Sequence, residues 1–99
     1  MTDVNTTLNS RANTHGDFVD NGVIMQNLKE VMRCMGKNWQ EHKLSCHQRE
    51  ALDMIQHKIG RILSGNPNEP DHWHDIAGYA TLVENILRTG NSHIPNQSA

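Results

Sequence analysis

The chain has 99 residues, of which 35% are hydrophobic, 4% aromatic and 20% charged, so it can form at most one domain with a small, mainly aliphatic core. This size excludes a large multidomain enzyme. The net charge is −2 when the seven histidines are neutral, so no overall basic field draws the chain to DNA, RNA or an anionic membrane.

Both ends of the chain are polar. Residues 1–13 are rich in Asn and Thr, and they contain neither the apolar core of a secretory signal nor a run long enough to span a membrane. We therefore expect a cytoplasmic protein with no membrane partner. Because residues 1–13 lack apolar periodicity and residues 90–99 are rich in Asn and Ser, we expect a flexible arm and a flexible tail around a single helical domain at 14–89.

The first helix is predicted to follow the N-cap residue Asp17 and to end at Met35. Its apolar residues recur at steps of three, four and seven and therefore share one face. They are Phe18, Met25, Leu28, Met32 and Met35. Methionine packs adaptably, so this face suits a partner protein as well as a core. A short helical turn is expected near Trp39.

The second helix is predicted from Ser45 to Ser64. Ser45 and Gln48 form a capping-box pattern, in which each side chain can bond the backbone amide of the other residue, and Gly65 ends the helix. The expected core stripe is Ala51, Leu52, Ile55, Ile59, Ile62 and Leu63. Polar residues occupy the opposite face within about 80° of one another. They are Glu50, Asp53, His57 and Arg61.

The third helix is predicted to begin at the cap residue Asp71 and to extend to Arg88. Its apolar residues alternate at steps of three and four, which is typical of a bundle seam. They are Trp73, Ile76, Ala80, Val83 and Leu87. Strand signals are nearly absent, so we expect an all-α fold, a small bundle of three main helices. A core of this size is marginal by itself, and we therefore also expect a homo-oligomer.

Polar residues in register on the second and third helices indicate a phosphate-containing ligand. Lys58 and Arg61 stand one helical turn apart beside His57, and together they can neutralise a phosphate. Trp73 and Tyr79 offer stacking faces for a base, although Trp73 also fits the core seam.

Three further features fit such a ligand. Asp71 or Asp75 can bind ribose hydroxyls, and the turn from Thr14 to Asp17 can direct backbone amides at an anion. A glycine inside a helix costs roughly 1 kcal/mol relative to alanine. Gly78 therefore indicates close approach of another helix or a ligand just below Asp75, or tight helix packing alone.

Pairs of carboxylates raise the alternative of a metal site. Glu50 and Asp53 are three residues apart, and Asp71 and Asp75 are four residues apart. Four carboxylates facing inward from two helices could hold magnesium in a phosphate-cleaving bundle. Alternatively, Glu50 and Asp53 lie on a solvated face near basic residues, where such pairs contribute little.

Cysteine and histidine give weaker metal signals. Cys34 and Cys46 lie in different predicted elements and form no CxxC pair, so free reduced thiols are expected rather than a zinc site with His47. His72 and His74 point nearly 160° apart on a helix, so they cannot bind the same metal ion.

Segments between Arg11 and Leu87 resemble a family of small all-helical proteins that are common in tailed phages and prophages. The segments are Arg11 with HGDF at 15–18, NW at 38–39, QREALDMI at 48–55, HKI at 57–59, RIL at 61–63, and Asp71 with WHDIAGYA at 73–80. This resemblance implies a protein of the cytoplasm of an infected or lysogenic bacterial host.

More distantly, the helix pair is similar to the MazG-type all-α nucleotide pyrophosphohydrolases, which carry ExxE on one helix and ExxD on a later one. The resemblance implies that Glu50, Asp53 and Asp75 hold magnesium and activate water. The position three before Asp75 is His72 instead of an acid. This departure leaves a nucleotide-shaped polar pocket without a complete metal site.

Small phage proteins of this size and helical type also include sponges, oligomers that hold nucleotide signals of bacterial immunity without cleaving them. We therefore hypothesise a nucleotide-binding protein without a cofactor, which sequesters an ADP-ribose derivative or a cyclic nucleotide. The expected ligand-binding residues are Arg11, His15, Asp17, His57, Lys58, Arg61, Asp71, Trp73, Asp75 and Tyr79. The alternatives are a magnesium-dependent nucleotide pyrophosphohydrolase and a factor that binds a host protein.

Overall fold

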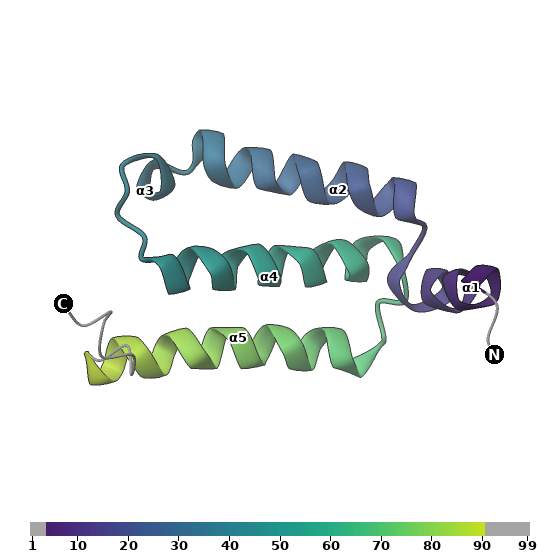
Figure 1. Cartoon of the computed structure of the whole chain (residues 1–99). Coiled ribbons are helices and arrows are strands. Elements are labelled where there is room, and N and C mark those ends of the chain that lie inside the picture. The colour runs from purple at the N-terminus through teal and green to yellow at the C-terminus, as the bar shows by residue number, and fades with distance from the viewer. Residues whose placement is uncertain (1–3, 91–99) are drawn as a thin grey trace.

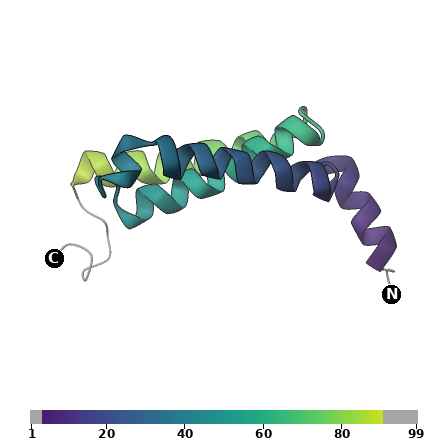
Figure 2. The same cartoon turned by 90° about the horizontal axis from the view of Figure 1, so that it is seen from above.

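The computed structural model describes residues 4–90, and every regular element in this range is helical, so the predicted all-α class is confirmed. In chain order the elements are α1 (Val4–His15), α2 (Phe18–Glu30), the π-helical turn η1 (Val31–Met35), α3 (Lys37–Gln40), α4 (Cys46–Ser64) and α5 (Pro70–Thr89). Helices α2, α4 and α5 run side by side with α4 in the middle (Figure 1). Helix α1 extends away from one end of this layer (Figure 2).

The predicted capping box of α4 is confirmed. The Ser45 hydroxyl accepts a hydrogen bond from the Gln48 backbone N–H at 3.2 Å, and the Gln48 side-chain oxygen accepts one from the Ser45 N–H at 2.9 Å. These bonds satisfy amides that the first turn of a helix leaves without a partner. The helix ends at Ser64, as the glycine that follows it predicts.

The first predicted helix begins where expected and changes its geometry near its end. The Asp17 side chain accepts a hydrogen bond from the Asp20 N–H at 3.3 Å and caps α2. The final five residues form η1, whose wider turn brings the Met32 carbonyl against Gly36, where a Cβ atom would collide with it. The expected short turn near Trp39 is α3.

Helix α5 corrects two predictions. It begins at Pro70 with Glu69 as the N-cap residue, so Asp71 lies in the first turn and is not the cap. Its rotation also differs from the predicted seam, because Trp73 is 55% exposed while His72 is buried. An ion pair to α4 and the burial of His72 fix this rotation, as described below.

The N-terminal segment is also helical. The sequence predicts a flexible arm at residues 1–13, and the structure gives α1 from Val4 onward. No residue of α1 is buried, which explains why apolar periodicity does not mark it. Of the predicted tail, Gly90 ends α5 in the left-handed conformation with a φ of 66°, and residues 91–99 lie outside the described range.

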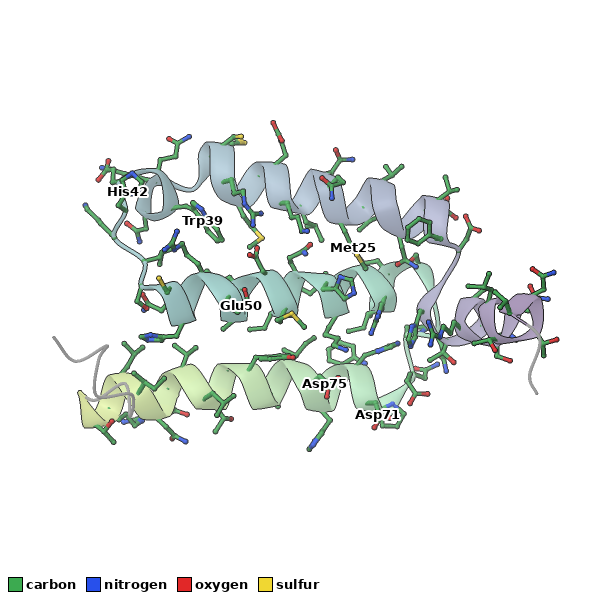
Figure 3. The ribbon with its side chains drawn as sticks, viewed as in Figure 1. Met25, Trp39, His42, Glu50, Asp71 and Asp75 are labelled. Carbon is green, nitrogen blue, oxygen red and sulfur yellow. The ribbon has the colours of Figure 1, made fainter. Side chains whose placement is uncertain are left out.

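The two neighbours of α4 cover opposite sides of that helix. On the α2 side, Met25 packs against Gly60, and Figure 3 shows Met25 between the two helices. On the α5 side, Lys58 reaches Asp75. Within the apolar stripe that the sequence places in the core, Ala51 alone is buried. Leu52, for example, is exposed.

Residues 4–90 consequently bury few apolar side chains. Met25 and Ala51 are the buried apolar residues in this range, and no side chain there is completely buried. No helix within the same range combines the length and the hydropathy needed to cross a lipid bilayer.

Candidate anion-binding site

The site lies where the end of α1 meets the end of α4. The Asn66 N–H donates a hydrogen bond to the Thr14 carbonyl at 3.0 Å and joins the two segments. Gly16 turns the chain with a φ of 90°, and a Cβ atom there would lie 2.5 Å from the Ser64 carbonyl oxygen. Only glycine fits this left-handed conformation and this close backbone approach.

Buried polar groups fix the position of His15 at this junction. The Asn21 side-chain amide donates to the His15 carbonyl at 2.6 Å, and the Ser64 hydroxyl donates to the Asn21 side-chain oxygen. Asn21 is itself buried. The first turn of α2 and the last turn of α4 therefore hold the chain at His15 from two sides.

His72 is the most buried polar residue described and completes the junction from α5. It is 2% exposed, and its Nε2 lies 3.2 Å from the Thr14 carbonyl oxygen. Because a carbonyl only accepts, Nε2 carries the proton and donates. Its ring also packs edge-on against His15, with the ring centroids 5.4 Å apart. The contact fixes both imidazoles.

Basic side chains surround these two histidines. Burial lowers the pKa of His15 below its ordinary value, and the positive charges of Arg61, His72, Lys58 and Arg11 lower it further. Burial likewise lowers the pKa of His57, again with the charges of Arg61 and Lys58. We call these six residues the basic cluster: Arg11, His15, His57, Lys58, Arg61 and His72.

Within residues 4–90, the cluster forms one ion pair with an acidic residue. Lys58 Nζ lies 2.9 Å from an Asp75 carboxylate oxygen, and this hydrogen bond holds the pKa of Asp75 below its ordinary value. The Arg61 side chain forms no hydrogen bond or ion pair with any residue between 4 and 90, although its backbone carbonyl accepts one from the Gly65 N–H. The cluster therefore contains the Arg61 guanidinium, whose charge no carboxylate of the described chain neutralises. Next to it lies Lys58, whose charge Asp75 neutralises.

The structure thus brings together six of the predicted ligand residues, namely Arg11, His15, His57, Lys58, Arg61 and Asp75. The other four form no hydrogen bond or ion pair with the cluster. Asp17 caps α2, and Asp71 is exposed at the start of α5, one turn from Asp75 (Figure 3). Trp73 donates its indole N–H to the Pro67 carbonyl at 2.9 Å, and Tyr79 is half-buried.

His72 is the functional residue that the sequence patterns did not predict. In the sequence it is notable only because it replaces an acid in the ExxD motif and because it and His74 cannot bind the same metal ion. The signal that could have found it is its spacing, because positions 72, 75 and 79 share one face of a helix. That face, and not the predicted seam, carries the contacts of α5 to the cluster.

The predicted metal ligands are not brought together. Asp53 accepts two hydrogen bonds from Arg33, at 2.8 and 3.0 Å, on the side of α4 that faces α2. Asp75 instead pairs on the α5 side, and Glu50 is exposed on the N-terminal half of α4 (Figure 3). The described range contains no group of three or more metal-ligating side chains.

Arg33 shows how fully Asp53 is engaged. Its guanidinium carbon also lies 4.8 Å from the centre of the Trp39 ring, so one side chain ties η1 to both α3 and α4. The carboxylate of Asp53 is therefore already neutralised by the Arg33 guanidinium. Cys34 and Cys46 are both free, as expected.

The comparison with known proteins identifies the family. No curated protein and no solved structure matches the chain. A family model described as a domain of unknown function, DUF6378, matches residues 1–87. Since this match covers most of the sequence, the chain belongs to the DUF6378 family.

Proposed function

We propose that this protein binds a nucleotide and holds its phosphate groups at the basic cluster. The observation that carries the proposal is Arg61, which stands beside His15 and Lys58 without an acidic partner in the described chain. A guanidinium can donate two parallel hydrogen bonds to a phosphate, and such charge-assisted bonds are stronger than neutral ones.

The histidines of the cluster add a proton-dependent contribution. The pKa of His15 is lowered because the ring is partly buried among positive charges, so the uncharged ring is favoured at neutral pH. A bound phosphate would offset these positive charges and raise that pKa. Phosphate binding beside His15 should therefore be accompanied by proton uptake.

The acidic residues favour binding over cleavage. A magnesium-dependent hydrolase needs converging carboxylates that are free to hold the metal ion. Here Asp53 is engaged by Arg33 and Asp75 by Lys58, on opposite sides of α4. We therefore propose sequestration of an intact nucleotide, and we do not propose the hydrolase as a second function.

The resemblance to small phage and prophage proteins supplies the proposed biological role. In the cytoplasm of an infected bacterium, a protein that binds a nucleotide signal tightly would lower its free concentration and blunt the immune response that the signal triggers. We propose an ADP-ribose derivative or a cyclic nucleotide as this signal, because both carry the phosphates that the cluster would bind.

The test is a calorimetric titration of the full chain with ADP-ribose and, separately, with a cyclic dinucleotide. Arg61→Gln should weaken binding of the active ligand by about 10- to 100-fold, since hydrogen bonds to a charged group contribute about 1.5–3 kcal/mol. Arg88→Gln is the matched control, because Arg88 pairs with Glu84 near the far end of α5 and loses the same charge.

Equal affinities for wild type and Arg61→Gln would overturn the proposed site, and so would equal losses in both variants. The second result would show that net charge alone attracts the ligand. The enthalpy in buffers of different ionisation heat reports the proton uptake, which should shrink in His15→Gln.

A further inference from the structure

One face of the helix layer is continuous and mainly apolar, with Gln48 and the buried Gln56 among the side chains that line it. Two hollows open on it, of about 550 Å³ between α4 and α5 and about 450 Å³ between α4 and the segment from η1 to α3. The two hollows share Leu44, Leu52 and Ile55, so they are parts of one surface. We call this surface the apolar face, lined by Met32, Trp39, Leu44, Leu52, Ile55, Ile59, Ala80, Val83 and Leu87.

The apolar face contains most of the side chains that the chain would need for a core of its own. Of the expected core stripe of α4, only Ala51 is buried within residues 4–90. A folded chain of this size has little hydrophobic stabilisation to spare, so leaving this surface in water would remove much of it. The face therefore needs a cover whenever the protein is folded.

We propose that the cover is a second copy of this chain, packed face to face. A permanent requirement for a cover is best met by a partner that is present at the same concentration as the protein, and every copy provides one. The net charge of −2 opposes such pairing only weakly. This inference is independent of the proposed nucleotide site, because the basic cluster does not line the apolar face.

The rim of the face is suited to self-association. Glu84 and Arg88 border the hollow between α4 and α5, and Lys37 borders the other hollow. Both signs of charge are therefore present around an apolar centre, which is the pattern of protein interfaces and allows one surface to face its own copy.

The size of the face is also sufficient. The side chains that line the face along α4 run from Leu44 to Ile59, a length of about 22 Å at 1.5 Å per residue. Three elements side by side at interaxial distances of about 9 Å span about 27 Å. The footprint is thus about 600 Å², which is at the lower end of what each partner contributes to a stable interface of standard size.

A two-fold axis over α4, in the plane of the face, would lay α4 of one copy on α4 of the other. Leu52 and Ile55 line both hollows and would lie at the centre of the contact. The two three-helix layers would then enclose one shared apolar core.

Two leucines of α5 give a matched test. Leu87 is 60% exposed and lines the apolar face, whereas Leu82 is 62% exposed and does not. In a monomer, Leu87→Glu and Leu82→Glu would both place a charge at an exposed helical position and behave alike. In the proposed dimer, only Leu87→Glu buries the charge at the interface.

The oligomeric state of each variant is measured by sedimentation velocity of the full chain at concentrations from 1 to 200 μM. We expect wild type and Leu82→Glu to sediment as dimers of the 11.2 kDa chain, and Leu87→Glu to raise the dimer dissociation constant at least 10-fold. The unfolding midpoint should rise with concentration in the first two proteins.

A monomeric wild type at 200 μM would overturn the proposal, including the case in which a different protein covers the face. Dimers of equal strength in both variants would also overturn it, because the contact would then lie elsewhere. If Leu87→Glu does not fold, Leu87→Asn replaces it with an uncharged side chain. Leu82→Asn is then its control, and the same difference in dissociation constant is expected.

Discussion

The junction at His15 and the apolar face are stabilised in different ways. At the junction, the buried side chains of His72 and Asn21 and the half-buried Ser64 hydroxyl find partners within the chain, so the local structure is complete in a single copy. On the apolar face, side chains such as Leu52 find no such cover. Changes at the junction should therefore act on each chain separately, and changes on the face should act through association.

The largest effect is expected for a substitution that disrupts the junction at His15. Gly16→Ala adds a Cβ atom 2.5 Å from the Ser64 carbonyl oxygen at a residue with a φ of 90°. We expect a loss of about 3 kcal/mol in the free energy of unfolding, measured by urea denaturation at fixed protein concentration. Gly22→Ala is the control, because no atom lies within 4 Å of the position that its Cβ atom would take. Similar losses in both variants would contradict the close approach.

A second change removes one hydrogen bond from the junction. His72→Phe keeps a ring of similar shape but removes one of the two donors to the Thr14 carbonyl, since the Asn66 N–H remains, so we expect a loss of about 1 kcal/mol. His74→Phe changes the exposed histidine two residues later and should alter stability by less than about 0.5 kcal/mol. Thermal unfolding of both variants separates the buried histidine from its neighbour. An unchanged midpoint in His72→Phe would show that the bond contributes nothing.

A third substitution, at Gly78, lies outside both the junction and the apolar face. The sequence suggests that Gly78 allows a close approach below Asp75, yet no atom of the described chain lies within 4 Å of a Cβ atom there. Gly78→Ala should therefore raise the free energy of unfolding by about 1 kcal/mol, through helix propensity alone. A loss of stability that grows with protein concentration would instead place Gly78 at a contact between copies.

The smallest expected effect is the pH dependence of the junction. Because the folded pKa of His15 lies below the unfolded value of about 6.5, the folded chain binds fewer protons just below that pH. The contribution of His15 should be constant above pH 7 and should fall as the pH drops from 6.5 to 5, where His57, whose pKa is also lowered, adds to the decline. In His15→Gln this decline should be shallower, as urea titrations at several pH values would detect. An unchanged slope would assign the decline to other groups.

Sequence patterns predict the helices well where the signal is local. The caps of α4 and the start of α2 follow from side chains three residues apart, and the structure confirms both. The grouping of Lys58, Arg61 and His57 also follows from the period of one helix. Each of these predictions needs only the geometry of neighbouring residues.

Relations between helices were not predictable in the same way. The stripe of α4 identifies an apolar surface, but the period of a helix does not reveal which neighbour covers it, so the expected core is an open face. The rotation of α5 depends on His72 and on the pair of Lys58 with Asp75, which join residues distant in sequence. Asp53 could not be assigned from spacing either, because its partner Arg33 lies on another element.

The most direct test of the central claim follows the fate of the bound nucleotide. The purified chain would be incubated with ADP-ribose and with cyclic dinucleotides, with and without magnesium, then filtered, heat-denatured and analysed by mass spectrometry. We predict that one ligand is depleted from the filtrate and returns intact after heating, with or without magnesium. Recovery of magnesium-dependent cleavage products, or no depletion of any nucleotide, would contradict sequestration at the basic cluster.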